Sequence, residues 1–239
     1  MNKYALVTGA SRGIGKSIAQ SLAKEGYHLI LTCSKSSNEL ISFSSQLEKE
    51  YNITCIAKQC DMKNVQEVRC LFEDIPHLDL LVNNAGISYV GLLQDMEPEE
   101  WDEIISTNLS SAFYTSKYAI PLMLQNHVGH IINISSVWGN VGASAEVAYS
   151  ASKGGLNSFT KALAKELAPS GIQVNAIACG LIDTQMNAHL SEEDLSSLKE
   201  EIPAGRAGST DEVAEALLSI LKMPPYFTGQ IVTLDGGWT

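Results

Sequence analysis

The chain has 239 residues, 45% of them hydrophobic and 18% charged, which is enough to bury a sizeable core. Its formal net charge is −11 and its sequence pI is near 4.9. Nucleic acids and anionic membranes attract basic surfaces, so this charge argues against both as partners.

No apolar run approaches the roughly 18 residues of a membrane span. Met1-Asn2-Lys3 leads directly into an apolar segment and lacks the charged-then-apolar pattern of a signal peptide. The five cysteines are odd in number and show no C-x-x-C spacing, which disfavours disulfides and structural zinc. We therefore expect a reduced, cytoplasmic protein with no metal site.

Short apolar segments rich in β-branched residues alternate with helical patterns along the whole chain. Strands are predicted at 3–7, 28–33, 53–60, 78–82, 129–135, 172–178 and 230–234. Between them, Ile14-Ile18-Leu22 and Leu156-Phe159-Leu163-Leu167 follow helical spacing. This order predicts an α/β fold, a Rossmann-like doubly wound parallel sheet of about seven strands with helices on both faces. Neither a repeat nor a linker divides the sequence, so a single domain over 1–239 is expected.

Glycines and polar residues that could contact a ligand gather at the carboxyl ends of most of these strands. Thr8–Gly15 is glycine-rich and follows the first, and Asn83-Asn84-Ala85-Gly86 ends the fourth. Asp61, Ser135-Ser136 and Cys179-Gly180 end the third, fifth and sixth. Since open α/β sheets bind ligands at the carboxyl ends of their strands, we expect the site at that edge.

The glycines Gly9, Gly13 and Gly15 mark a tight turn between a strand and a helix. Glycine reaches positive φ and permits close approach to a pyrophosphate, while a helix N-terminus offers free N–H groups. The phosphate loop of nucleotide hydrolases needs four residues between its glycines; five separate Gly9 from Gly15, which excludes that motif.

The choice of dinucleotide depends on charge near the adenosine ribose. An acidic residue at the end of the second strand selects NAD, but this strand ends in Leu31-Thr32-Cys33-Ser34-Lys35. Arg12 and Lys35 can both face a 2′-phosphate, so the sequence favours NADP(H).

Tyr149 and Lys153 are four residues apart, which places them on one face of a helix. An ammonium near a phenol favours phenolate, so we expect Lys153 to lower the Tyr149 pKa from its usual value of about 10. Such a phenol can serve as a general acid and base near neutral pH.

Thr8-Gly9-x3-Gly13-x-Gly15, Asn83-Asn84-Ala85-Gly86, Asn108, Ser136 and Tyr149-x3-Lys153 together resemble the short-chain dehydrogenase/reductase family over the whole length. The resemblance implies that Tyr149 protonates a carbonyl oxygen, that Ser136 hydrogen-bonds the same oxygen, and that Lys153 holds the nicotinamide ribose. It implies that Asn108 holds a water in a proton relay. The N-terminal half then binds the cofactor, and the C-terminal half holds the catalytic and substrate groups.

The same resemblance implies a cofactor site along the strand ends, with Asp61-Met62 beside the adenine and Ile182 and Thr184 at the nicotinamide carboxamide. The expected cofactor contacts are Gly9, Ser11, Arg12, Gly13, Ile14, Gly15, Lys35, Asp61, Met62, Asn83, Ala85, Gly86, Tyr149, Lys153, Gly180, Ile182 and Thr184. Cys179 departs from the family, which usually has proline there.

Within the family, the chain looks most like the bacterial 3-oxoacyl-carrier-protein reductases. The segments Asn175-Ala176-Ile177, Pro203-x-Gly205-Arg206 and Leu234-Asp235-Gly236-Gly237 fit that group. Those enzymes dock an acidic carrier protein through arginines near the site entrance, and His127 and Ser170 stand at the matching positions here. A chain at −11 gains no long-range steering towards an acidic partner.

The segment 135–150 and the ending Gly236-Gly237-Trp238 also resemble the elongation factor P 5-aminopentanone reductases, which reduce a protein-bound ketone ending in an amine. Glu146 is then either an anchor for that amine or an ordinary surface residue. Trp138 and Met186 are further substrate candidates, although Trp138 more often packs a loop.

Residues 183–200 are expected to form a lid, with an interface helix as the competing account. The resemblance implies a homotetramer with the Tyr149 helix at one interface. A dinucleotide-binding scaffold without catalysis is the remaining function class, and the complete Ser–Tyr–Lys set argues against it.

Overall fold

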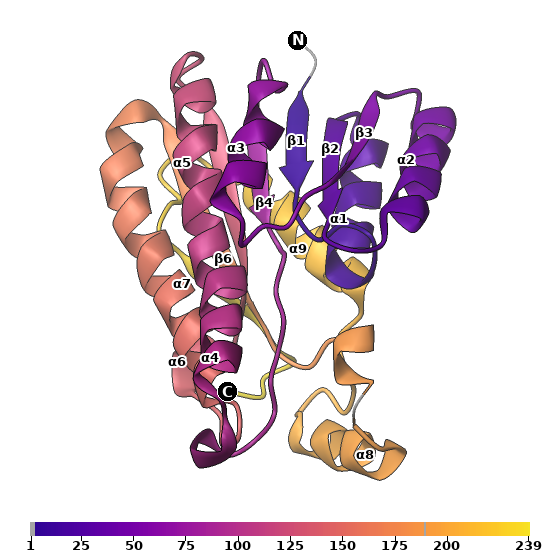
Figure 1. The fold of residues 1–239 in the computed structure, drawn as a ribbon, viewed down its shortest axis with the longest axis vertical. Coiled ribbons are helices and arrows are strands. Elements are labelled where there is room, and N and C mark those ends of the chain that lie inside the picture. The colour runs from indigo at the N-terminus through magenta and orange to yellow at the C-terminus, as the bar shows by residue number, and fades with distance from the viewer. Residues whose placement is uncertain (1–2, 189) are drawn as a thin grey trace.

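A computed structural model describes residues 3–188 and 190–239. Its centre is a parallel seven-stranded sheet in the order β3-β2-β1-β4-β5-β6-β7 (Figure 1). The strands are β1 (Tyr4–Val7), β2 (His28–Cys33), β3 (Cys55–Gln59), β4 (Leu80–Asn83), β5 (Gly129–Ser136), β6 (Ile172–Cys179) and β7 (Ile231–Leu234). The strand order reverses between β1 and β4, and this is the position where doubly wound sheets bind dinucleotides.

The seven predicted strands are confirmed, with ends that differ by at most two residues. The two-residue differences fall where the chain enters β3 and β4: residues 53–54 and 78–79 precede the strands that begin at Cys55 and Leu80. The predicted Rossmann-like α/β fold with helices on both faces is therefore correct.

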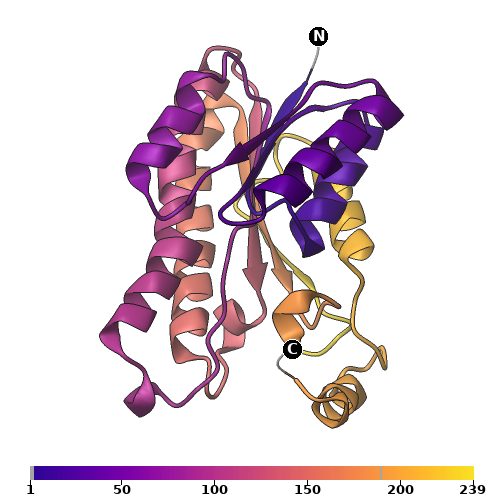
Figure 2. The ribbon, with the colours of Figure 1, turned by 45° about the vertical axis from the view of Figure 1, so that its right-hand side comes forward.

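Two helical layers cover the sheet (Figure 2). One contains α1 (Gly13–Lys24), α2 (Ser37–Tyr51) and α9 (Thr210–Leu221), and the other contains α3 (Val65–Glu73), α5 (Ser111–Leu124) and α7 (Val147–Leu167). The predicted helical stripes lie on α1 and α7, where Ile18, Leu22, Leu156 and Leu163 are buried.

Each layer buries its own apolar cluster against one face of the sheet. Ile18, Leu47 and Leu217 belong to the first cluster, whereas Leu71 and Met123 belong to the second. Burial of such side chains contributes roughly 1.5–3 kcal/mol each, so the two layers fix the sheet as a rigid frame for its carboxyl edge.

The shorter elements gather towards the end of the molecule to which the strands run. Helices α6 (Trp138–Val141) and α8 (Glu192–Glu201) and the C-terminus all lie there in Figures 1 and 2. Helix α4 (Pro98–Ile105) continues through a π-helical turn (Ser106–Ser110) into α5. Short 3-10 turns occupy Leu93–Asp95, Ala168–Ser170 and Gln185–Asn187.

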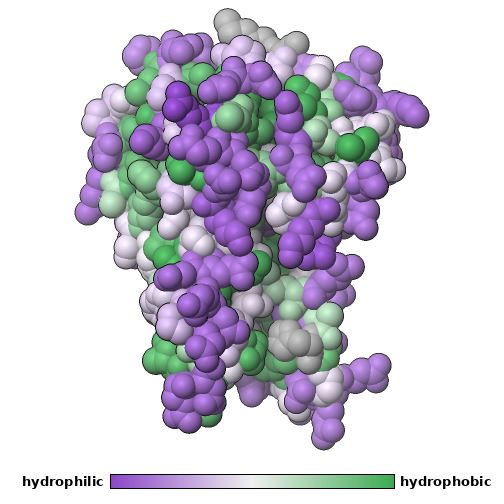
Figure 3. All heavy atoms as spheres, in the orientation of Figure 1, coloured by the Kyte–Doolittle hydropathy of each residue, from purple (hydrophilic) through white to green (hydrophobic). Residues whose placement is uncertain are grey.

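The face drawn in Figure 3 is mostly hydrophilic, with scattered apolar side chains. Within the described residues, no helix combines the length and the apolar character needed to cross a bilayer.

Candidate active site

The turn after β1 has the backbone shape that the glycine pattern predicts. Gly9 and Gly13 take φ values of +65° and +55°, which favour glycine. A Cβ on Gly15 would lie 2.5 Å from the Asn84 amide nitrogen, so only glycine fits beneath the turn. Ser11 and Arg12 form the turn itself, Arg12 is the residue before α1, and Ile14 packs on the core. The turn and the α1 N-terminus therefore form a cradle that fits a pyrophosphate.

Asn84, which the sequence analysis did not single out as a site residue, locks this turn. Its amide donates to the carbonyl oxygens of Thr8 (2.9 Å) and Gly9 (3.0 Å). In return, the Thr8 hydroxyl accepts hydrogen bonds from the backbone N–H groups of Asn84 (2.9 Å) and Ala85 (3.0 Å). The two segments that flank the β1–β4 switch point are thus fastened to each other.

The side chain of the neighbouring Asn83, a predicted residue of the cofactor cleft, is turned into the protein interior. The side chain is buried, donates to Asn133 Oδ1 (2.8 Å) and accepts from the Thr115 hydroxyl (2.6 Å). Because side chains alternate along a strand, Asn83 faces the α5–α7 layer. The Asn83 side chain therefore joins β4 to β5 and α5 in the interior of the protein.

The segment after β6 forms the other wall of the cleft. Thr184 approaches the glycine turn: its Cγ2 lies 3.6 Å from where a Cβ on Gly13 would stand. Arg12 Nη1 donates to Gln185 Oε1 over 3.4 Å. Ile182 is buried and pairs with Gly208, and Gly180 packs against Asp235. The predicted carboxamide segment therefore lies beside the predicted pyrophosphate turn.

The loop between β2 and α2 carries Lys35, which is exposed. Gln59 at the end of β3 holds both sides of this loop, because it accepts from the Ser37 hydroxyl (2.9 Å) and donates to the Ser34 carbonyl (2.9 Å). Lys35 is close enough to Glu103 to contribute to the lowered pKa of that carboxyl, whose main cause is a hydrogen bond from Lys63.

Asp61 and Met62 differ in what they expose. Asp61 is partly exposed and its carboxylate accepts from the Lys63 backbone N–H over 3.2 Å. The Met62 side chain is buried in the core, so only its backbone remains for an adenine contact.

Ser136, at the end of β5, meets Tyr149 in the first turn of α7. The two side chains share a hydrogen bond. Ser136 Oγ also accepts from the Trp138 backbone N–H over 3.2 Å. The adjacent Ser135 instead donates to Asn157 Oδ1 (2.6 Å) within the α7 layer. Ser136 is therefore the serine that faces the tyrosine.

Lys153 lies one turn beyond Tyr149, with its Nζ 5.6 Å from the centroid of the phenol ring. Nζ is buried and donates to the Ile134 carbonyl over 2.8 Å. Burial lowers the Lys153 pKa from its ordinary value to about 8. Gly86 is adjacent, since a Cβ there would lie 3.5 Å from Nζ.

The expected lowering of the Tyr149 pKa is wrong for this structure. Burial raises the pKa of Tyr149 well above its ordinary value, and the negative charge of Glu146 raises it further. The hydrogen bond with Ser136 acts in the opposite direction but does not outweigh them. Burial removes the water that would stabilise the phenolate, and the hydrogen bond from Ser136 is too weak to replace it.

Cys179 occupies the end of β6 directly opposite Ser136 in the strand register. It is buried, and burial raises the pKa of its thiol to about 12, so it is a neutral thiol at physiological pH. Its backbone carbonyl accepts from the Val137 N–H over 2.9 Å. Cys179 thus joins the β5 and β6 ends beneath the site. All five cysteines are free thiols.

Asn108 lies in the π-helical turn, a geometry often found at functional sites. Its side chain bonds the Ile87 backbone at both ends, accepting from N–H (2.8 Å) and donating to the carbonyl (2.9 Å). It also donates to Ser152 Oγ over 3.0 Å. The side chain therefore fastens the segment after β4 to α7, beside Lys153.

The three substrate candidates lie around this centre. Glu146 is the residue before α7, and its charge acts on Tyr149. Trp138 begins α6 and packs edge-on against Trp238 at 4.9 Å between ring centroids. Met186 is 42% exposed on the 3-10 turn before α8.

His127 and Ser170 do not lie at the entrance of the site in this chain. Both precede a strand, β5 and β6 respectively, and therefore lie at the amino edge of the sheet. They are neighbours there, since a Cβ on Gly171 would lie 2.8 Å from the His127 carbonyl. Within one copy of the chain, both residues therefore lie at the opposite edge of the sheet from Ser136.

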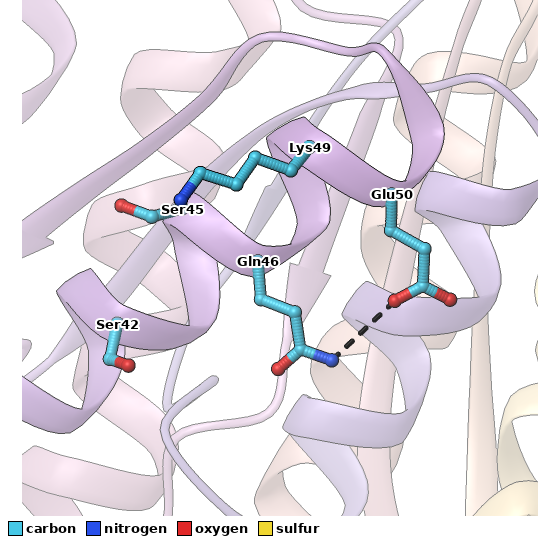
Figure 4. Close-up of a pocket in the computed structure, with 5 residues that line it drawn as sticks. All are labelled: Ser42, Ser45, Gln46, Lys49 and Glu50. Carbon is cyan, nitrogen blue, oxygen red and sulfur yellow. Dashed lines mark hydrogen bonds between the residues drawn. The ribbon is translucent and has the colours of Figure 1, made fainter.

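A shallow hollow on α2 lies apart from all of these residues. It is lined by Ser42, Ser45, Gln46, Lys49 and Glu50 (Figure 4). These exposed polar side chains come from a single helix, with a 3.5 Å hydrogen bond from Gln46 to Glu50. The residues that the structure describes contain no group of three His, Cys, Asp or Glu side chains arranged to hold a metal.

Comparison with known proteins agrees with this geometry. Residues 3–195 match the short chain dehydrogenase family, so the chain belongs to that family of oxidoreductases. Membership implies a nicotinamide dinucleotide cofactor, for which the turn after β1 provides a cradle.

Named relatives match over nearly the full length. A FabG 3-oxoacyl-[acyl-carrier-protein] reductase of Aquifex aeolicus (strain VF5) is 39% identical, with 98% of this chain and 96% of the relative aligned. The FabG reductase of Escherichia coli (strain K12) is 40% identical with the same coverage. The oxidoreductase YmfI of Bacillus subtilis (strain 168) is 39% identical over 100% of this chain and 99% of its own.

Proposed function

We propose that this protein is an NADPH-dependent reductase that converts a ketone to a secondary alcohol, in the manner of a 3-oxoacyl-[acyl-carrier-protein] reductase. The observation that supports this best is the meeting of Ser136, Tyr149 and Lys153 at the β5–α7 junction, opposite the glycine turn. The similarity to reductases named for that reaction supports the substrate class.

The chemistry that a reduced nicotinamide would supply, when bound in this cleft, is hydride for the carbonyl carbon. The Tyr149 hydroxyl donates its proton to the carbonyl oxygen as negative charge develops there, and a phenol with a raised pKa stays protonated and ready to do so. The Ser136 hydroxyl donates a second hydrogen bond to the same oxygen.

Lys153 supports this step in two ways. Its ammonium would hold the nicotinamide ribose, and its pKa of about 8 would let it pass a proton towards Tyr149 near neutral pH. The Asn108 side chain, bonded to Ile87 and Ser152, lies beside Lys153, and Asn108 would hold the water of a proton relay there.

NADP(H) is proposed over NAD(H) because Arg12 and Lys35 are cationic and β2 is not followed by an acidic residue that would bond the ribose hydroxyls. Arg12 at the glycine turn and Lys35 in the loop after β2 are both exposed. Gln59 fixes the loop that carries Lys35. A 2′-phosphate would be held between the two cations.

The remaining features are proposed on the family's pattern. Residues 183–200 form the lid over the substrate, apart from His189, which lies outside the described residues. The ketone is carried on a protein, the enzyme is cytoplasmic, and four copies assemble through the α7 face.

The alternative substrate is the amino-ketone of an elongation factor P 5-aminopentanone reductase. The observation that favours it is the Glu146 carboxylate, whose charge reaches the catalytic phenol. A substrate ammonium at Glu146 would gain this interaction, whereas a phosphate-bearing acyl carrier would be repelled.

The test is NADPH oxidation by the purified protein with an acetoacetyl thioester and an amino-ketone side by side. Preference for the thioester supports the first substrate and preference for the amino-ketone the second. Glu146→Gln should raise KM for the amino-ketone alone; equal effects on a neutral ketone would remove the alternative. Cofactor binding without oxidation of NADPH by either ketone would instead indicate a dinucleotide-binding scaffold.

A further inference from the structure

We propose that Trp238, the residue before the C-terminal Thr239, is a positioning residue for Ser136 and acts through Trp138. This inference rests on the proposed ketone reduction and adds the C-terminal tail to the machinery of the same site.

Residues Asp235–Thr239 form a sharp bend, here called the hook, which the Asp235 carboxylate holds in place. Asp235 accepts hydrogen bonds from the backbone N–H groups of Gly237 (2.9 Å) and Thr239 (2.8 Å) and from the Thr239 hydroxyl (3.1 Å). Gly236 and Gly237 make the bend at φ values of +69° and +88°. The five residues Asp235–Thr239 therefore have a defined shape that presents Trp238.

The hook packs between two segments that border the site. Its Gly236 carbonyl accepts from the Ala204 N–H over 3.1 Å, just beyond α8. On the other side, Asp235 is so close to Gly180 that a Cβ there would lie 2.7 Å from the Asp235 Cβ. The position of Trp238 is therefore set by the base of α8 and by the end of β6.

Trp238 contacts the first residue of α6. The rings of Trp138 and Trp238 meet at 4.9 Å between centroids and at 60° between planes. Such edge-to-face pairs contribute about 0.5–1.5 kcal/mol beyond the burial of their area.

Helix α6 has four residues, too few to be stable by itself, so packing must hold it. On its α7 side, Asn140 accepts from the Asn157 amide over 2.9 Å. Trp238 packs against its first residue, Trp138.

The backbone N–H of Trp138 donates to Ser136 Oγ over 3.2 Å. This donor occupies a lone pair of the hydroxyl oxygen and leaves the hydroxyl hydrogen to be donated elsewhere. Fixing Trp138 therefore fixes the direction in which Ser136 donates. Loss of Trp238 would leave this direction less defined and weaken the hydrogen bond to the carbonyl oxygen of the substrate.

The test compares Trp238→Ala and Trp238→Phe with the wild type, and Tyr226→Ala is the matched control. Tyr226 is a fully exposed aromatic residue in the same C-terminal stretch, with 99% of its area accessible. We expect Trp238→Ala to lower kcat for ketone reduction about tenfold, with KM and Kd for NADPH unchanged, because misplacement of a catalytic group costs rate and leaves the cofactor site intact. Trp238→Phe keeps an aromatic edge and should recover most of kcat, whereas Tyr226→Ala should leave it unchanged.

Far-ultraviolet circular dichroism supplies a second measurement. The exciton signal of the Trp138–Trp238 pair should vanish in Trp238→Ala. It should persist in Trp101→Phe, which removes the third tryptophan of the chain, in α4. A normal kcat in Trp238→Ala despite loss of the signal would overturn the inference, as would a rise in the Kd for NADPH equal to the loss in kcat. A wild type that reduces no ketone would overturn the proposed function itself, a result distinct from either of these.

Discussion

The side-chain nitrogen of Lys153 donates a hydrogen bond to the carbonyl oxygen of Ile134 over 2.8 Å, inside the protein. This contact holds the ammonium at the end of β5 rather than on the phenol of Tyr149. Burial lowers the pKa of Lys153 and raises the pKa of Tyr149, so the tyrosine is not driven towards phenolate.

The buried Lys153 makes stability depend on pH. Its folded pKa of about 8 lies below the ordinary value of 10.5. Between these values the unfolded chain binds a proton that the folded chain does not, so this group's contribution to the unfolding free energy rises with pH. The wild type minus Lys153→Met difference in unfolding free energy should rise by about 2 kcal/mol from pH 8 to pH 10. Denaturant titrations at several pH values measure it, and a difference independent of pH would contradict the assignment.

Tyr149→Phe should remove ketone reduction without unfolding the protein. The variant loses the donated proton and the bond to Ser136 but keeps the ring. We expect kcat to fall by about 10²–10⁴, the usual contribution of a general acid. Stopped assays for alcohol product, with thermal melting as the control for folding, provide the measurement. Near-normal turnover in the folded variant would remove Tyr149 from the mechanism.

Lys35→Glu should reverse the preference for the cofactor. A carboxylate in the loop after β2 repels a 2′-phosphate and can bond ribose hydroxyls, so KM for NADPH should rise at least about tenfold while KM for NADH falls. Lys49→Glu is the matched control, because it makes the same charge change on the exposed face of α2. An equal response of the two variants would mean that Lys35 acts only through net charge.

Gly15→Ala should damage the cofactor turn selectively. The added methyl group would meet the Asn84 amide, which holds the turn through Thr8 and Gly9. Overpacking of this kind costs about 1–3 kcal/mol, and the Kd for NADPH should rise as the turn shifts. Gln20→Ala, on the exposed side of α1, is the control, and unchanged NADPH binding in Gly15→Ala would show that the turn does not cradle the pyrophosphate.

The strand ends and the Tyr149–Lys153 pair could be predicted from the sequence because they follow from local periodicity. The positions of all seven strands depend on short apolar runs, and i, i+4 spacing fixes one helix face.

The different hydrogen-bond partners of Asn83 and Asn84 could not be predicted from local periodicity. Both follow from the same dipeptide, but one turns inward to Asn133 and the other outward to the glycine turn. The direction of the Tyr149 pKa shift could not be predicted either. It depends on how far burial removes water from the phenol, which the spacing to Lys153 does not determine. The Trp138–Trp238 contact joins residues 100 positions apart, and no local pattern contains it.

The most direct test of the central claim is the rate of cofactor oxidation by the purified wild type with an acetoacetyl thioester, measured with NADPH and with NADH. The account predicts oxidation that requires the ketone, disappears in Tyr149→Phe, and is at least about tenfold more efficient with NADPH than with NADH. Binding of NADPH without oxidation by any activated ketone would contradict it.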